Sequence, residues 1–228
     1  AQSLQALTVG SVSATDFETD DLIALGKKME ASSFSRSGPG IWDVLKPEVV
    51  EYGGTHVYNK GSIPPQLTTP PEVCPELIRK SPEGPAFSSD DIGTSFAVPK
   101  VTYIASQIEK ILPDSPALLY RALIAQSARW PKQISELSKE ECISTLRQIG
   151  YGIPDVDRAT HNDDYRVTLI TPSLLELGDD DAHIFRIPIP EELSRVGEDY
   201  DILVEVTLSY AANPRRTRRY IKGYLSTW

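Results

Sequence analysis

The chain is poor in cysteine, in histidine and in long apolar runs. Its two cysteines, Cys74 and Cys142, lie far apart without metal-ligand spacing, so we expect both thiols to be reduced, which favours a cytoplasmic location. No apolar run reaches the length that crosses a bilayer, and no signal peptide is visible. The three histidines, His56, His161 and His183, each stand alone, and a lone histidine is most often structural or exposed. We therefore expect none of them to act as a catalytic base.

Positive charge is also scarce. The 32 acidic residues outnumber the 23 basic ones, and the net charge of -9 disfavours general binding to nucleic acid, because phosphate neutralisation needs clustered Lys and Arg. A basic patch does occur near the end of the chain, at Arg215, Arg216, Arg218, Arg219 and Lys222. No aromatic stacking platform accompanies this patch, so we expect it to meet an acidic partner or the chain's own acidic surface.

A hydroxyl-bearing turn at residues 93–99, Gly-Thr-Ser-Phe-Ala-Val-Pro, is the feature around which the chain is organised. Proline is tolerated in the first turn of a helix, so the predicted helix begins at about Phe96 and Ser95 lies at or beside its N-cap. There the helix dipole would stabilise an oxyanion, the N–H of Ser95 is free to donate, and Gly93 lets a substrate backbone approach closely. An ordinary serine cap is the alternative interpretation.

This turn resembles the nucleophile motif of the subtilisin-like serine peptidases, Gly-Thr-Ser-x-Ala-x-Pro, at every fixed position. The resemblance extends, in the family's order, to the strand after the oxyanion-hole segment, the Ser-x-Phe-Ser-x-x-Gly turn, the Lys-Pro-Asp-Val strand and the closing glycine pair, at residues 6–12, 33–39, 46–53 and 150–152. It implies acyl transfer by Ser95, with Gly93, Thr94 and Ser95 forming the surface that the substrate and its oxyanion approach. We expect no cofactor and no metal ligands among the site residues.

The family's catalytic Asp and His and its oxyanion Asn precede the position that Ala6 matches, and they are absent here. The resemblance therefore predicts a fragment, with the upstream half of the peptidase domain as its partner. Without a base to activate Ser95, this piece alone should be a poor nucleophile. Loss of the upstream half should also leave the strand at 6–12 and the apolar face of the helix at 98–112 uncovered.

The patterns and the resemblance together predict an α/β fold, the C-terminal half of a mainly parallel sheet with helices on both faces, followed by a small antiparallel β module. We expect the peptidase part to span residues 1–154 and the β-rich module 155–228. The predicted strands of the first part are Ala6–Val12 and Val49–Tyr52. The predicted helices cover about 20–29, 98–112, 115–127 with Ser115 as the cap, and 134–149.

The proline-rich stretch at 64–85 excludes both helix interior and central strand and predicts a long loop. It leads into the serine turn, so it is either a solvated insertion or a lid on the rim of the cleft. Beyond the serine, Lys100, Thr102 and Tyr103 stand where the family commonly has His, Ala and Gly. We expect this departure to alter the packing beside the helix without touching the hydroxyl chemistry.

The predicted β module contains four candidate strands, at 165–170, 183–189, 202–210 and 220–228. Its acidic run, Asp179 to Asp181, could bind calcium, but the spacing matches no known loop and favours a solvated turn.

The sequence therefore predicts a serine endopeptidase that acts on protein or peptide substrates. The alternative is a non-catalytic binding or scaffold piece, which recruits a partner through the proline-rich loop and the basic β module. A weak likeness of the tail to large intracellular bacterial subtilases suggests an AAA-type ATPase as a partner. We expect neither nucleic acid nor a membrane as a partner.

Overall fold

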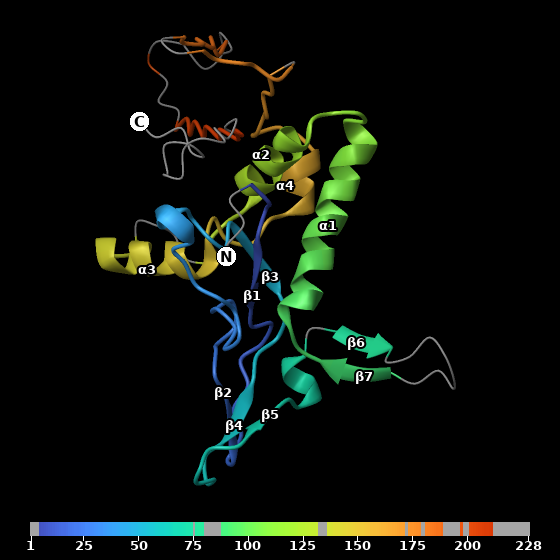
Figure 1. The fold of residues 1–228 in the computed structure, drawn as a ribbon, viewed down its shortest axis with the longest axis vertical. Helices are drawn as coiled ribbons and strands as arrows, with labels where there is room; N and C mark the ends of the chain where they lie inside the picture. Colours follow the sequence, from blue (N-terminus) through green and yellow to red (C-terminus); the bar gives the residue numbers. More distant parts are fainter. Residues whose placement is uncertain are drawn as a thin grey trace, which may run out of the picture. The chain divides into compact units, whose positions relative to one another are not determined.

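The computed structural model describes residues 5–74, 76–79, 88–131, 136–171, 173–178, 181–188, 197 and 201–211. The chain divides into two compact units, one made of residues 1–161 and 207–228 and the other of residues 162–206. Figure 1 labels the helices and strands of the first unit. None of the described helices is both long enough and apolar enough to cross a membrane.

A two-stranded parallel sheet lies at the centre of the first unit. Strands β1 (Val9–Val12) and β3 (Val49–Tyr52) pair in register, with Val9 opposite Val49 and Val12 opposite Tyr52. Both strands were predicted from their β-branched, apolar residues, and the mixed α/β fold with a parallel sheet is confirmed. The strand predicted at 6–12 is shorter in the structure, where it begins at Val9.

Helices cover the two faces of this sheet, because alternate residues of a strand point to opposite sides. Val49 packs into a cluster with residues of the long helix α1 (Thr94–Ile111). Its neighbour Val50 packs with Val12 and with Ile149 of helix α3 (Lys139–Ile149). Accordingly, Figure 1 shows α1 and α3 on opposite sides of β1 and β3.

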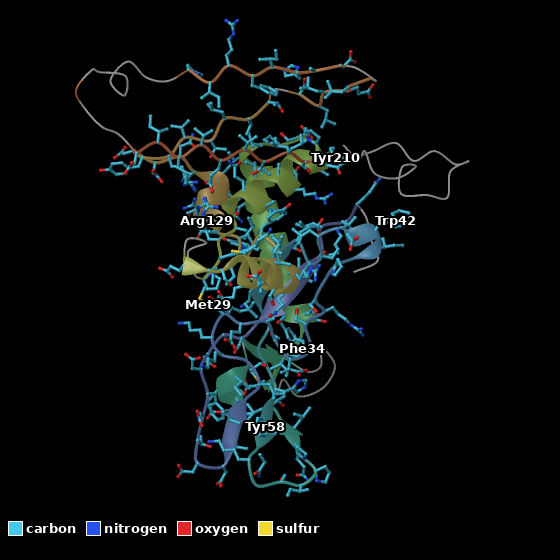
Figure 2. The ribbon with its side chains drawn as sticks, turned by 90° about the vertical axis from the view of Figure 1, so that its left-hand side faces the viewer. Met29, Phe34, Trp42, Tyr58, Arg129 and Tyr210 are labelled. Carbon is cyan, nitrogen blue, oxygen red and sulfur yellow. The ribbon has the colours of Figure 1, made fainter. Side chains whose placement is uncertain are left out.

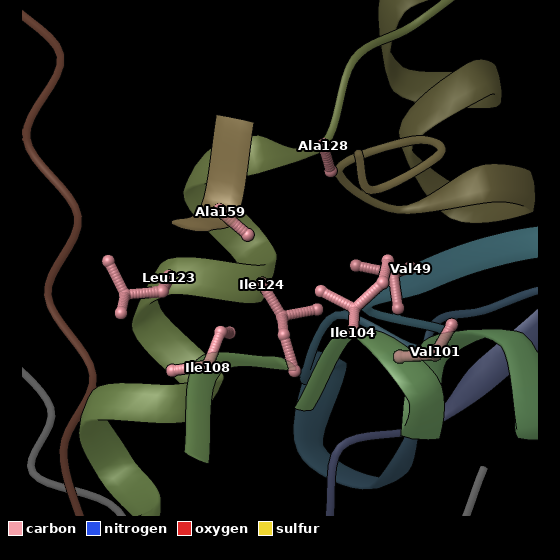
Figure 3. Packing of buried hydrophobic residues seen from close by; sticks show 8 residues of the cluster. All are labelled: Val49, Val101, Ile104, Ile108, Leu123, Ile124, Ala128 and Ala159. Carbon is pink, nitrogen blue, oxygen red and sulfur yellow. The ribbon is translucent and has the colours of Figure 1, made fainter. Parts of the chain in front are cut away.

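The larger apolar core forms between α1, α2 (Ala117–Ser127) and α4 (Val156–Thr160). Its members are branched or small side chains that are nearly inaccessible to solvent, and Figure 3 shows them: Val49, Val101, Ile104, Ile108, Leu123, Ile124, Ala128 and Ala159. The buried residues of α1 are spaced three or four positions apart along the chain, as the sequence predicted for a helix with one buried face.

The expectation of an uncovered half-domain is right only in part for the described residues, since Val98 and Ile111 of α1 are 44% and 50% exposed while most of the apolar face is buried. On α1, Ala97, Val101, Ile104 and Ile108 are each at most 4% exposed, and Val12 of β1 is fully buried. Helices α2 and α4 supply the cover that was expected from an upstream half, because they fold back onto the same face of α1.

Both edges of the parallel sheet are hydrogen-bonded to neighbouring segments. On the β1 side, the N–H of Ser32 donates to the carbonyl of Ser11 at 2.9 Å. On the β3 side, the N–H of Val50 donates to the carbonyl of Gly152 at 3.0 Å, and Tyr151 donates to Glu48 at 2.7 Å. The glycine pair at 150–152 therefore runs beside β3, and a Cβ at either glycine would overlap backbone atoms of the neighbouring segment.

The remaining strands form small antiparallel sheets. Strands β2 (Leu22–Ala24), β4 (Val57–Asn59) and β5 (Leu67–Thr68) make one, and β6 (Glu76–Arg79) with β7 (Ser88–Asp91) makes another. The helix predicted at 20–29 is wrong, because Leu22–Ala24 pairs with β4 instead. The proline-rich stretch contains β5, a short 3-10 turn at Pro71–Val73 and β6, so the single long loop is wrong for its described residues.

The helices after α1 largely match their predictions but begin later. Helix α2 is capped by Pro116 and not by Ser115. Helix α3 begins at Lys139 and not at 134, because Ser138 and Glu141 form a capping box in which each side chain accepts the other residue's N–H.

The predicted C-terminal strands are not found where the structure describes the chain. The described parts of 165–170, 183–189 and 202–210 contain no hydrogen-bonded strand, although Asp163 and Arg166 form one isolated bridge. Their side chains lack the burial that stabilises strands, since Tyr165, Leu203 and Val206 are each more than 80% exposed. The candidate strand at 220–228 and the basic patch at 215–222 lie outside the described residues.

A buried carboxylate fixes the amino ends of both parallel strands. Glu48, which is 4% exposed, accepts hydrogen bonds from the N–H and hydroxyl of Thr8 at 2.6 and 2.8 Å and from Lys46 Nζ at 2.8 Å. Its other oxygen pairs with Arg121 of α2. Lys46 is fully buried and also donates to the carbonyl of Ala6 at 2.9 Å. The Glu48 network thus joins β1, β3 and α2 through one charge.

Replacement of this carboxylate should be strongly destabilising. In Glu48→Gln, the amide NH₂ would face Lys46, Thr8 or Arg121, which are all donors, and the buried Lys46 and the half-buried Arg121 would lose their counter-ion. We expect the free energy of unfolding to fall by about 3–5 kcal/mol, measured by urea denaturation. Glu18→Gln breaks the exposed Glu18–Lys60 pair and should cost less than about 1 kcal/mol. Equal losses in the two variants would contradict the role of the Glu48 network.

Candidate active site

Ser95 lies in the first turn of α1, at the second helical position. The helix begins at Thr94, with Gly93 as its N-cap, so it starts two residues earlier than predicted and Ser95 is not itself the cap. Pro99 is therefore inside the helix, and it has no N–H to give to the carbonyl of Ser95, four residues earlier. Ser95 is exposed, and its hydroxyl has no hydrogen-bond partner among the described residues. The side chain is thus available to an external group.

The backbone of the serine turn is held by the carboxyl end of the parallel sheet. The N–H of Gly93 donates to the carbonyl of Gly53 at 2.8 Å, and the N–H of Gly53 donates to the carbonyl of Val12 at 3.1 Å. Gly53 directly follows β3, and Val12 ends β1. Ligand sites of open α/β sheets lie at this edge, beyond the carboxyl ends of the strands. Ser95 therefore occupies the edge where a substrate would be expected.

Two glycines make this close approach possible. A Cβ on Gly53 would overlap Ser11 Oγ and would lie 2.6 Å from the carbonyl oxygen of Gly93. Gly93 has φ 158° and ψ 155°, a backbone conformation that residues with a side chain rarely adopt. A Cβ on Gly93 itself would make only ordinary contacts, at 3.6 Å or more, so the close approach of a substrate backbone to Gly93 stays a prediction.

Hydroxyl groups form a buried layer beneath the serine turn. Ser11 Oγ and Ser32 Oγ are 2.7 Å apart, and Ser32 Oγ donates to the carbonyl of Gly54 at 2.5 Å. Ser11 is fully buried and Ser32 is 3% exposed. This layer fixes the segment after β3 against β1, and so it supports the position of Gly53 and Gly93.

His56 does not serve Ser95 in the described structure. Its Nδ1 lies 2.8 Å from Ser33 Oγ, and Ser33 Oγ also accepts the N–H of His56 at 3.3 Å. Phe34, labelled in Figure 2, meets the imidazole edge-on with ring centroids 5.6 Å apart. These contacts agree with the expectation that His56 is structural.

An acidic side chain that the sequence analysis did not single out lies beside α1. Glu51 of β3 is only 8% exposed, and its Oε1 accepts the N–H of Tyr52 at 2.8 Å. Burial raises the pKa of the Glu51 carboxyl, while that N–H and the charge of Lys100 act in the opposite direction. Lys100 Nζ lies 5.8 Å from the centroid of the Tyr52 ring. Lys100 stands at the position where the family commonly has His. The structure therefore places a cation at this position, and its charge acts on the buried Glu51.

Within the described part of the chain, no group of three or more His, Cys, Asp or Glu side chains could hold a metal ion. Of the predicted acidic run, Asp179 and Asp180 lie outside the described residues.

Both Cys74 and Cys142 are free thiols, as predicted. Burial and the charges of Asp90, Asp91 and Glu72 raise the pKa of the Cys74 thiol, so it is a poor nucleophile.

The sequence profile of the subtilase family matches residues 1–158. The chain belongs to the subtilase family. This match covers β1, β3, the serine turn, α1 and the glycine pair, which are the segments that carry the resemblance. An uncharacterized protein of Sinorhizobium fredii, y4bN, is 32% identical over 233 residues. The alignment includes 98% of this chain but 52% of that protein, so the chain spans about half the length of this relative.

The sequence predicted the serine turn but missed the acid beside it. Ser95, Gly93 and Thr94 come together at one helix end because they are contiguous. Glu51 was overlooked because it falls within a strand of buried residues, Val-Val-Glu-Tyr. An acid inside such a run was itself the available signal, since a charged residue is rarely fully buried without a reason.

The pKa of Glu51 predicts a pH-dependent stability. Because the folded-state pKa is raised, the contribution of Glu51 is fully present below the unfolded pKa of about 4.5 and is lost as pH rises through the folded value. Glu51→Gln should therefore gain stability relative to the parent as pH increases from about 4 to 7, measured by urea denaturation at several pH values. The exposed Glu176→Gln is the control. A constant difference between Glu51→Gln and the parent across this range would contradict the shift.

Proposed function

We propose that the chain is the nucleophile-bearing part of a subtilisin-like serine endopeptidase. The observation that carries the proposal is the exposed Ser95 hydroxyl in the first turn of α1, at the carboxyl edge of the parallel sheet of a subtilase. A serine in this position has the helix dipole and free N–H groups beside it, and both favour developing negative charge.

In the proposed reaction, Ser95 Oγ attacks the carbonyl carbon of a peptide bond and forms an acyl-enzyme, which water then hydrolyses. The N–H of Ser95 donates to the oxyanion, while Gly93 and Thr94 shape the surface along which the substrate lies. The base that takes the proton of Ser95 and the carboxylate that orients this base are expected from the upstream half of the domain. That half is the proposed partner of this chain, and an AAA-type ATPase remains a further proposed partner.

A non-catalytic binding or scaffold role is the alternative. The observation in its favour is that His56, the histidine nearest in sequence to the serine turn, is engaged with Ser33. The two proposals differ in one respect, namely whether Ser95 becomes nucleophilic when the rest of the protein is present.

The 228-residue chain alone should show no measurable peptidase activity. Loss of triad members costs on the order of 10⁴ to 10⁶ in rate, and here the base and its orienting acid are missing from the sequence. Hydrolysis of casein by the purified chain is the assay. Activity that disappears in Ser95→Ala would show that the chain supplies its own base and would contradict this account.

In a longer form that contains the family's Asp and His, Ser95 should react covalently with a fluorophosphonate probe. Ser95→Ala should abolish both labelling and casein cleavage, because the hydroxyl is the nucleophile, and it should leave the thermal unfolding midpoint within a few degrees of the parent. Ser106→Ala on the same helix is the matched control. Retained cleavage in Ser95→Ala would favour the non-catalytic interpretation of this serine.

A further inference from the structure

A cavity of about 470 Å³ lies beside the serine turn. It is bounded by β3, by the first three turns of α1 and by the segment that leads into α4. The ring of Phe96, the residue after Ser95, lines the cavity, and it also lies close to Gly93, since a Cβ there would be 3.6 Å from Phe96 Cε2. The cavity and the serine turn therefore share a wall.

The lining of this cavity includes a buried carboxylate. Glu51 lines it and is 92% buried, from an exposure of 8%. Among the described residues, the one hydrogen bond to its carboxylate comes from the N–H of Tyr52. A carboxylate can accept about four hydrogen bonds, so Glu51 retains capacity for a donor that enters the cavity.

The walls suit an extended aliphatic stem. Pro99, Pro154 and Val156 are apolar, and Tyr103, which is 56% exposed, adds an aromatic side chain to the lining. Long basic side chains pack their methylene stems on apolar surfaces, and a guanidinium also stacks on aromatic rings. A short apolar side chain would offer the Glu51 carboxylate no donor beyond the N–H of Tyr52.

The charges in the cavity favour a cation. Glu51 and Asp155 contribute two carboxylates against one ammonium, that of Lys100. Asp155 Oδ1 already accepts the N–H of Arg158 at 2.7 Å as the cap of α4. The Lys100 ammonium lies over the Tyr52 ring, 5.8 Å from its centroid. Glu51 is therefore the carboxylate with the most capacity left for an incoming donor.

We propose that this cavity is a subsite for an arginine or lysine side chain of the polypeptide on which Ser95 acts, with Glu51 as the residue that binds its charged group. The proposal rests on the proposed peptidase function for the identity of the ligand, and it adds that the substrates carry a basic residue near the bond that is cleaved. Lys100 and Tyr103, two of the residues that depart from the family's usual pattern, line the site together with Glu51.

Direct binding to the 228-residue chain tests the subsite without any need for catalysis. The probes are N-acetyl-arginine amide and its neutral analogue N-acetyl-citrulline amide, titrated by NMR at constant pH and ionic strength. We expect the arginine probe to bind at least about tenfold more tightly, the effect of one charge-assisted hydrogen bond. Glu51→Gln should remove this difference, and Glu176→Gln, with the same change in net charge, should preserve it. Equal affinity of the two probes for the parent, or an unchanged preference in Glu51→Gln, would overturn the proposal.

Cleavage kinetics in the longer, Asp- and His-containing form link the subsite to the serine. Quenched peptides that differ only by arginine or citrulline, placed in turn at each position around the scissile bond, should reveal one position with an arginine preference. There Glu51→Gln should lower kcat/KM about tenfold for the arginine peptide and leave the citrulline peptide unchanged. A uniform loss for both peptides would refute the subsite. Absence of Ser95-dependent cleavage would refute the peptidase function instead, while the binding result would still report on Glu51.

Discussion

The carboxylate of Glu48 is the constraint on which the arrangement of the first unit depends. It accepts from Thr8, Lys46 and Arg121, so the amino ends of β1 and β3 and the middle of α2 meet at one buried charge. A single buried carboxylate with several donors has few geometries that satisfy all of them, and buried ionic networks of this kind can fix register as well as stability. Here the register in question is that of the two parallel strands.

The serine turn depends on this register at the opposite end of the same strands. A shift of β3 against β1 would move Gly53, whose carbonyl holds the N–H of Gly93 and whose N–H is held by Val12. The Glu48 network and the serine turn are thus the two ends of one short sheet. In physical terms, a buried charge at the amino ends of the strands positions a hydroxyl at their carboxyl ends.

The parts of the fold that the sequence predicted are those that local patterns determine. Val101, Ile104 and Ile108 are spaced three and four residues apart, which specifies a helix with one buried face. The β-branched Val49 and Val50 specify a strand. The helix expected at 20–29 failed because acidic and basic residues placed for a helix dipole do not outweigh pairing of Leu22–Ala24 with a distant strand.

The candidate site shows the same division. The contiguous motif around Ser95 could be predicted, whereas the cavity could not, because it brings together residues from β3, α1 and the approach to α4. Tyr103 was noticed as a departure from the family, but its relation to Glu51 depends on packing between distant segments. The start of α1 at Thr94 was also missed, because a proline within a helix was interpreted as a mark of its first turn.

The hydrogen-bonded flanks of the parallel sheet have a consequence for self-association. An open strand edge is a template on which another chain can extend a sheet, and this is a common route to aggregation. Here the segment around Ser32 occupies one side of β1, and the Tyr151–Gly152 segment occupies the outer side of β3. The outward-facing carbonyls of Ser11 and Glu48 and the N–H of Val50 are already used, so a second polypeptide could not extend the sheet through these groups.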